Sequence, residues 1–231
     1  MGRQIMGGAY RMNLKALLSV WSSQVFGFQV GTLDLQGLPS IEDVKSENKD
    51  LDVVFVKCPG WQDPTNVTAL DYLYDMERTT NITSHGYVRG TFDQVHKVQI
   101  LNASRLGIAA TAFSDSRFLR DPRLKSSAPN MYVRWLAENP AYVLSDTPDV
   151  GFLVPSRDSD GSARISLLAV AQEIRKTGVG RRLTSSVFAL EYGVWRVRVS
   201  SRNINAIRFY ESIGFRMKSV TTAFHVWMDG V

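Results

Sequence analysis

A glycine-containing turn with basic neighbours lies in the last third of the chain. An apolar run that ends at Ala171 leads into Arg175 and Lys176, and Gly178 and Gly180 follow. We predict a strand, a turn, and then a helix that begins at the glycines. The first turn of a helix has unpaired N–H groups and partial positive charge, and glycine lets a phosphate approach the backbone closely. The pattern therefore indicates a pyrophosphate-binding turn.

This spacing alone does not identify the ligand. A tight strand-to-helix turn with solvated basic side chains would show the same residues. The segment has no Gly-x-Gly-x-x-Gly pattern, and Gly178-Val-Gly180-Arg-Arg lacks the Gly-Lys-Ser/Thr ending of a P-loop. The interpretation as a phosphate site therefore needs a second element.

That element lies some 25 residues further on. It is a probable amphipathic helix with polar and aromatic residues at fixed positions, namely Asn203, Ala206, Tyr210, Gly214 and Phe215. From this pattern alone, Tyr210 can be an amphipathic tyrosine that packs on a half-buried helix.

Together the two segments resemble the GCN5-related N-acetyltransferase (GNAT) superfamily. Its first signature, Arg/Gln-x-x-Gly-x-Gly/Ala, is matched by Arg175, Gly178 and Gly180. Its second, an Asn-x-x-Ala helix that leads to Tyr and Gly-Phe, is matched within Asn203–Phe215. The resemblance covers about residues 165–217 and extends back to about residue 103.

The resemblance implies acetyl-CoA as cosubstrate and assigns its site residue by residue. The strand supplies backbone to the pantetheine arm, the turn amides hold the pyrophosphate, and Asn203 hydrogen-bonds the arm. A splay beside the strand would free a backbone N–H to polarise the thioester carbonyl. The cofactor-binding residues are Leu168, Val170, Arg175, Lys176, Thr177, Gly178, Val179, Gly180, Arg181 and Asn203. Tyr210 is the expected catalytic residue, which protonates the leaving thiolate.

The general base is left open. Glu173 lies beside the predicted turn, where a structural role fits better. Ser166, Ser200 and Ser201 offer hydroxyls that could hold a water between splayed strands. Attack by an amine on a bound thioester can also proceed with little base assistance, because positioning supplies much of the acceleration.

The acceptor is indicated less directly. About 100 residues precede the predicted catalytic unit, and this organisation resembles the TDP-fucosamine acetyltransferase group of bacterial enzymes. Three short patches carry that likeness: Phe26-Gly27, expected in an early strand, the pair 114–118 and 132–138, and residues 223–227. The resemblance implies the amine of a nucleotide-linked amino sugar as acceptor. A peptide or protein N-terminus, another small amine, or a non-catalytic acyl-CoA-binding module are the alternatives.

Charge and composition agree with an anionic small ligand. The formal net charge is +5, and the 27 basic residues are spread along the chain, which disfavours nucleic acid as a partner. Candidate phosphate contacts and stacking residues, each also compatible with a solvated helix face or core packing, are Arg117, Arg120, Arg123, Arg134, Tyr132 and Trp135.

The single cysteine, Cys58, and three scattered histidines show no metal-ligand spacing, so we expect no metal. No apolar run is long enough to span a bilayer, and the basic start is a poor match to an export signal. We expect a cytoplasmic protein with no membrane span. A homodimer is compatible with the sequence.

The predicted fold class is α/β (α+β), a GNAT fold whose mixed central sheet has splayed strands and flanking helices. We place a smaller N-terminal α/β domain at 1–101 and the catalytic domain at 102–231. Expected strands are 26–35, 51–58, 91–101, 141–145, 150–155, 163–171 and 194–200, and expected helices are 68–79, 103–113, 130–138, 178–192 and 203–213. A final hairpin is expected through Phe224–Met228.

Overall fold

The computed structural model describes residues 12–80, 95–98, 102–190 and 193–229. Its strands are β1 (Leu17–Leu18), β2 (Val30–Asp34), β3 (Val53–Pro59), β4 (Thr68–Thr80), β5 (Val95–Val98), β6 (Ala141–Leu144), β7 (Gly151–Arg157), β8 (Ala163–Val170), β9 (Gly193–Ser200) and β10 (Arg216–Trp227). Its helices are α1 (Val20–Phe26), α2 (Ile41–Glu47), α3 (Ala103–Thr111), α4 (Arg117–Arg120), α5 (Ala128–Glu138), α6 (Val179–Leu190) and α7 (Ile204–Ser212), with a 3-10 turn at Gln172–Ile174.

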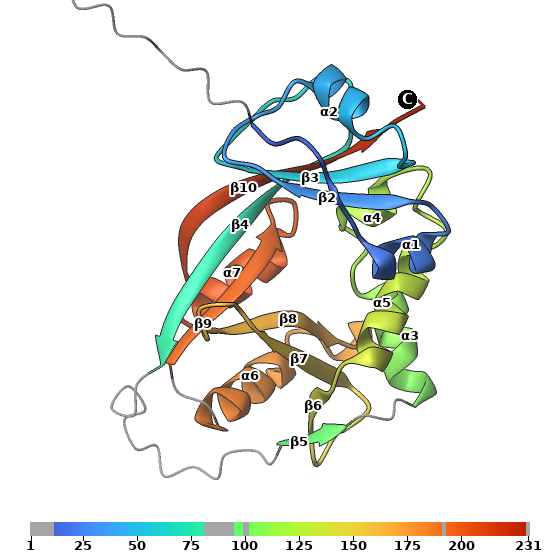
Figure 1. Ribbon diagram of the computed structural model, residues 1–231. Helices are drawn as coiled ribbons and strands as arrows, with labels where there is room; N and C mark the ends of the chain where they lie inside the picture. Colours follow the sequence, from blue (N-terminus) through green and yellow to red (C-terminus); the bar gives the residue numbers. More distant parts are fainter. Residues whose placement is uncertain (1–11, 81–94, 99–101, 191–192, 230–231) are drawn as a thin grey trace, which may run out of the picture.

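These strands form one mixed sheet in the order β1-β2-β3-β10-β4-β9-β8-β7-β6-β5. The pairs β2–β3 and β8–β9 are parallel, and the other neighbours are antiparallel. Figure 1 shows α1, α3 and α5 gathered at one side of the sheet, away from α6 and α7. The predicted fold class, a mixed sheet flanked by helices, is confirmed.

Strand β7 shows how both faces of the sheet are buried. Phe152 and Val154 pack in a cluster with residues of α3 and α5. Leu153 points to the other face and packs with residues of α6 and α7. Because side chains alternate along a strand, a strand covered on both sides is apolar at every position. This explains the uninterrupted apolar run at 150–154 in the sequence.

The helix predicted over 68–79 is wrong, because these residues form the long strand β4. Leu73 and Met76 are both buried, three positions apart, as on a helix. They lie on opposite faces of the strand, and each face is covered by a different part of the protein: Leu73 lines a cleft, whereas Met76 joins the α6–α7 cluster. Because the buried side of β4 changes between Leu73 and Met76, its buried residues have the three-residue spacing that is typical of a helix.

Two further expectations at the ends of the chain are corrected. Phe26 belongs to helix α1, and Gly27 ends that helix in the left-handed conformation with φ 75°, so the early strand begins only at Val30. The predicted final hairpin is instead one strand, β10, which pairs antiparallel with β3 and with β4. Residues 222–227 of this strand are buried on both of its faces.

Strands from both sides of residue 101 share this sheet. Strand β10, near the end of the chain, lies between β3 and β4, which come from the first 101 residues. The described parts of the predicted strand 91–101 form β5, and the rest of that range lies outside the described residues. The division into domains at residue 101 stays a prediction.

Replacing Phe224 with alanine tests the junction of β10 with β3. The Phe224 side chain is fully buried and packs in a cluster with Val54 and Val56 of β3. We expect Phe224→Ala to lower the free energy of unfolding in urea by about 3–5 kcal/mol, through lost burial and the cavity left behind. Met217→Ala, on the exposed part of the same strand, should change it by less than about 0.5 kcal/mol. Equal effects of the two substitutions would contradict the placement of β10.

Candidate active site

Strands β8 and β9 touch only at their beginnings. Their parallel pairing covers three residue pairs, Ala163↔Trp195, Arg164↔Arg196 and Ile165↔Val197. Strand β8 then continues to Val170 and β9 to Ser200, and the two diverge (Figure 1). Beyond these pairs, no described strand pairs with the inner edge of β8 or β9, and this is the splay expected from the sequence.

Two arginines stand side by side where the strands are joined. Arg164 binds Asp158 through both Nε and Nη2 at 2.7 Å. Arg196 reaches the same Asp158 at 3.3 Å and Asp160 at 2.7 Å. These hydrogen bonds from Arg164 and Arg196 hold the pKa of Asp158 below its ordinary value. The shared carboxylates let two like charges lie next to each other at the closed end of the splay.

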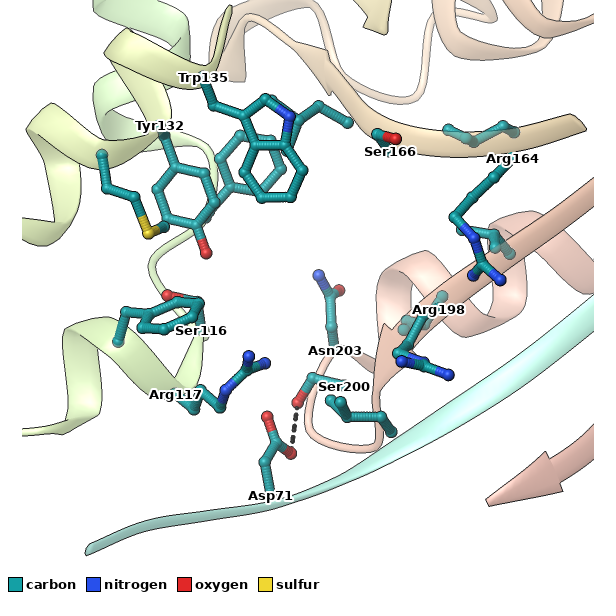
Figure 2. Close-up of a pocket in the computed structure, with 18 of the residues that line it drawn as sticks. Asp71, Ser116, Arg117, Tyr132, Trp135, Arg164, Ser166, Arg198, Ser200 and Asn203 are labelled. Carbon is teal, nitrogen blue, oxygen red and sulfur yellow. Dashed lines mark hydrogen bonds between the residues drawn. The ribbon is translucent and has the colours of Figure 1, made fainter. Parts of the chain in front are cut away.

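A cleft of about 690 Å³ opens where the strands separate. Leu168 of β8 and Ser200 of β9 line it, together with Asn203 and Tyr210 of the segment that follows β9. Figure 2 shows the opposite wall, where side chains of α4 and α5 face the same space. The cleft therefore brings the end of the splayed sheet together with the predicted general acid.

The predicted phosphate turn follows β8 directly. Lys176 and Gly178 have positive φ angles of 68° and 94°, and α6 begins at Val179. Among the residues that the structure describes, the backbone N–H groups of 176–181 have no acceptor. Six unpaired amides at a helix start, beside the exposed Arg175 and Lys176, form a site suited to an anion.

Side-chain contacts tie this turn to the end of β8 and to α7. The Nε atom of Arg175 donates to the carbonyl of Val170 at 3.1 Å. A Cβ on Gly180 would lie 3.4 Å from the ring of Phe209, so a glycine lets the turn pack closely on α7. Arg181 donates to the hydroxyl of Ser212, the last residue of that helix, at 3.1 Å. Thr177 turns its hydroxyl back to the carbonyl of Ile174.

Asn203 is the N-cap of α7. Its Oδ1 accepts the backbone N–H of Ala206 at 3.0 Å, which satisfies one of the unpaired amides of the first turn. The amide nitrogen of Asn203 points into the cleft (Figure 2). One side-chain atom therefore holds the helix while the other is presented to a ligand.

Tyr210 lies deeper on the same helix. Its side chain is 6% exposed and packs between the rings of Phe209 and Phe215, at centroid distances of 5.3 and 5.4 Å. Burial raises the pKa of the Tyr210 phenol above its ordinary value. Within the described part of the chain, its hydroxyl forms no hydrogen bond. A neutral phenol with an unused donor thus lines the cleft.

Of the arginines considered from the sequence, Arg117 lines the cleft. Arg120 binds Asp71 and the carbonyl of Leu70. The other two engage partners elsewhere: Arg123 pairs with Asp229 and stacks on Trp227, and Arg134 pairs with Glu138. Tyr132 and Trp135 both line the cleft, and Tyr132 also stacks on Phe113 at 4.4 Å.

Sequence reasoning missed Asp71. This carboxylate on β4 is 2% exposed, lines the cleft, and accepts a hydrogen bond of 2.8 Å from the Ser200 hydroxyl. Its other oxygen lies 3.0 Å from Nη2 of Arg120. Because β4 was predicted as a helix, nothing indicated that Asp71 faces β9. The alternation around Asp71-Tyr72-Leu73 was the available signal.

The other hydroxyls considered for the base have different partners. Ser166 lines the cleft and exchanges a 2.6 Å hydrogen bond with Ser156. The backbone N–H of Ser201 donates to the carbonyl of Tyr72. Glu173 lies in the 3-10 turn and is exposed. Ser200 is therefore the one of these candidates that is hydrogen-bonded to a carboxylate.

A buried polar cluster supports the cleft from behind. His225 Nδ1 lies 2.7 Å from Asp121 Oδ2, which also accepts from Trp227 Nε1 and Thr68 Oγ1 at 3.1 Å. The imidazole stacks at 4.3 Å on Phe55, a residue that lines the cleft. Its Nε2 is buried and has no partner among the described residues. Burial lowers the pKa of His225 to about 4, so the ring is neutral near pH 7.

The span 135–217, which contains β8, the turn, α6, β9 and α7, matches the model of the acetyltransferase (GNAT) domain family. This segment is therefore a GNAT acetyltransferase domain, and the protein is an acetyl-CoA-dependent acyltransferase. The sequence matches no protein of curated function.

Solved structures are similar over much of the chain. A functionally unknown conserved protein from Staphylococcus epidermidis ATCC 12228 has 10% identity and a TM-score of 0.63, with 99% of this chain and 96% of that chain covered. Its likeness shows a shared fold. A protein described as a GNAT-family acetyltransferase from Novosphingobium aromaticivorans DSM 12444 has 21% identity and a TM-score of 0.49, with 75% and 73% covered.

The described residues contain no helix long and apolar enough to cross a membrane. In the same residues, no group of three or more His, Cys, Asp or Glu side chains is arranged to hold a metal ion.

The neutral, buried His225 predicts a loss of stability in acid. Between pH 6.5 and about 4 the unfolded chain binds a proton on this imidazole that the folded protein does not bind. The free energy of unfolding should therefore fall as the pH is lowered through this range, by up to roughly 3 kcal/mol from this group. Urea unfolding at pH 7 and pH 4.5 measures the change.

His225→Gln is the matched control, because glutamine can still donate to Asp121 but does not titrate. We expect the difference in the free energy of unfolding between wild type and this variant to become smaller as the pH falls. Parallel pH profiles for the two proteins would show that His225 is not the group responsible.

Proposed function

We propose that the protein transfers acetyl from acetyl-CoA to the primary amine of a nucleotide-linked amino sugar, with Tyr210 as general acid. The observation that supports this most strongly is the unpaired amides of residues 176–181 beside a cleft that Tyr210 lines. The unpaired amides suit a diphosphate, and the Tyr210 phenol supplies a proton donor next to the splayed sheet.

In this proposal, different residues around the splay bind different parts of acetyl-CoA. Leu168 and Val170 supply backbone groups on the free edge of β8 to the pantetheine arm. The turn amides and the cations of Arg175 and Lys176 bind the pyrophosphate, together with Thr177, Gly178, Val179, Gly180 and Arg181. Asn203 donates its free amide nitrogen to the arm.

The proposed chemistry is direct attack by the amine on the thioester carbonyl. A new C–N bond forms, the C–S bond breaks, and the Tyr210 hydroxyl gives its proton to the departing thiolate. The proton released by the amine passes to the Ser200 hydroxyl, which hands its own to Asp71 across their 2.8 Å hydrogen bond. Because burial raises its pKa, Tyr210 holds its proton at neutral pH until the thiolate forms.

The acceptor class is supported by the lining of the cleft. Four cations line it, namely Lys57, Arg117, Arg164 and Arg198, and of these Arg117 has no ion-pair partner on a described residue. Aromatic side chains, among them Trp135, supply flat apolar surface on which a base or sugar can stack. An aromatic cleft with one unpaired guanidinium favours an acceptor that has an anionic group and a ring system, and a nucleotide-linked amino sugar has both.

Substituting Gly178 tests the phosphate turn. Its φ of 94° is a conformation that alanine adopts only with strain of roughly 1–2 kcal/mol, although a Cβ would meet no atom within 4 Å. If the turn relaxes to relieve that strain, the amides move, and we expect Gly178→Ala to weaken coenzyme A binding about tenfold by calorimetric titration.

Gly107→Ala is the control for this change. Gly107 lies in α3 without a positive φ and with open space around it, so alanine there should leave coenzyme A affinity unchanged. If the wild-type protein shows no saturable coenzyme A binding, the proposed cofactor site is wrong.

Replacing Tyr210 with phenylalanine tests the acid. The ring and its packing remain, so we expect kcat to fall by about 10²–10⁴ while the Kd for coenzyme A changes by less than about threefold. Because burial raises its pKa, wild-type activity should show no decline from phenol ionisation up to about pH 10. Free-thiol release measures the rates.

Equal losses of turnover and coenzyme A affinity in Tyr210→Phe would instead show that the phenol positions the cofactor. The same assay compares acceptors. Turnover of peptides, without turnover of nucleotide-linked amino sugars, would contradict the proposed acceptor and favour a peptide acetyltransferase. Unchanged turnover in Tyr210→Phe would remove the phenol from the chemistry.

A further inference from the structure

We infer that Arg117, with the hydroxyls of Ser116 and Tyr132, forms a subsite that binds an acidic group of the acceptor, a phosphate or a carboxylate. This rests on the proposed function, because it assumes that the acceptor occupies the cleft opposite Tyr210. It adds the chemical requirement that the acceptor carry an acid group as well as an amine.

The charge of Arg117 is not compensated by an ion pair. In the described part of the protein, no carboxylate lies within ion-pair distance of its guanidinium, which stacks on the Phe118 ring at 4.3 Å. The other cations that line the cleft each have an acidic partner. The pairs are Lys57 with Asp34 at 3.4 Å, Arg164 with Asp158 at 2.7 Å, and Arg198 with Asp75 at 2.7 Å.

This uncompensated guanidinium is also partly withdrawn from water. Burial lowers the pKa of Arg117, Tyr132 and Asp71 oppose this shift, and the nearby charges of Arg198 and Arg120 add to it. Desolvating a charge without a counter-ion is unfavourable. A ligand anion would compensate the charge, and an open cleft in front of the guanidinium gives such an anion access.

Two hydroxyl donors face the same space. Figure 2 shows the hydroxyls of Ser116 and Tyr132 and the guanidinium of Arg117 directed toward one part of the cleft. The Ser116 oxygen accepts from the N–H of Leu119 at 3.4 Å, and the Ser116 hydroxyl also interacts with the Tyr132 phenol, so the two hydroxyls form one polar pair beside the guanidinium. Burial raises the pKa of Tyr132, so its phenol is a neutral donor.

This arrangement matches the chemistry of a tetrahedral or planar oxyanion. A guanidinium presents several N–H groups in one plane and binds phosphate or carboxylate through two of them. Two neutral hydroxyls add donors without adding charge. No carboxylate of the cleft is paired with Arg117, so the group that completes the subsite comes from the ligand.

The test compares acceptors that carry an acid group with one that does not. The substrates are an amino sugar linked to a nucleoside diphosphate, the same amino sugar without the nucleotide, and a carboxylate-bearing amine of similar size. Arg117→Gln should lower kcat/KM for the diphosphate acceptor by about 10- to 100-fold, mainly through KM, because a charge-assisted contact is lost. For the neutral sugar the change should be below about threefold. Arg117→Lys should recover part of the loss.

Arg134→Gln is the matched control, since it removes the same charge from the neighbouring helix α5 outside the cleft. It should leave both acceptors unaffected. Equal losses for acidic and neutral acceptors in Arg117→Gln, or no loss for either, would overturn the inference. If Arg117→Gln lowered kcat/KM for the carboxylate amine but not for the diphosphate acceptor, the bound group would be a carboxylate and not a phosphate.

Urea unfolding gives a readout that is independent of activity. Removing an uncompensated charge should leave the unfolding midpoint of Arg117→Gln unchanged or higher than that of wild type. A clearly lower midpoint would mean that Arg117 supports the fold and would count against the subsite. If wild type binds coenzyme A but acetylates no amino sugar, the proposed function fails. The acidic and neutral amines that it does acetylate then test Arg117 separately.

Discussion

The short contact between β8 and β9 positions every group in the active site. The two strands meet over three residue pairs, where the fully buried Trp195 lies opposite the small Ala163. They cannot close further, because each is held along its outer edge: β8 pairs with β7 as far as Val170, and β9 pairs with β4 as far as Ser200. Bringing the splayed ends of β8 and β9 together would break those outer ladders, so the outer pairings hold the cleft open.

The segments that follow β8 and β9 contribute different functional groups to the cleft. The predicted phosphate turn follows the end of β8, and α7 follows the end of β9 after a few residues, capped by Asn203. Gly180 in one segment packs against Phe209 in the other. The turn and the phenol of Tyr210 are therefore fixed relative to each other by packing, although they come from separate strands. Such positioning is the main contribution that a protein makes to attack on a bound thioester.

Local motifs made the turn and helix of the proposed cofactor site predictable from sequence, whereas pairings between distant segments hid parts of the cleft opposite it. The turn at 175–180 and the helix from 203 were predicted because each motif lies within one short segment. Strand β4 was mistaken for a helix because its buried face changes between Leu73 and Met76. That error concealed Asp71, whose partners Ser200 and Arg120 lie 129 and 49 residues away along the chain.

The same reasoning applies to the charges. The sequence offered several arginines near the acceptor site with equal claims, since composition does not show which carboxylate each one reaches. In the fold, Arg123 and Arg134 bind acids outside the cleft, and Arg120 neutralises the buried Asp71. Of these four arginines, Arg117 is the one that lines the cleft. No described residue forms an ion pair with it. A paired arginine stabilises the wall, but an unpaired one keeps its binding capacity for a ligand. The pattern of ion pairs therefore separates the structural cations of this cleft from the one suited to recognition.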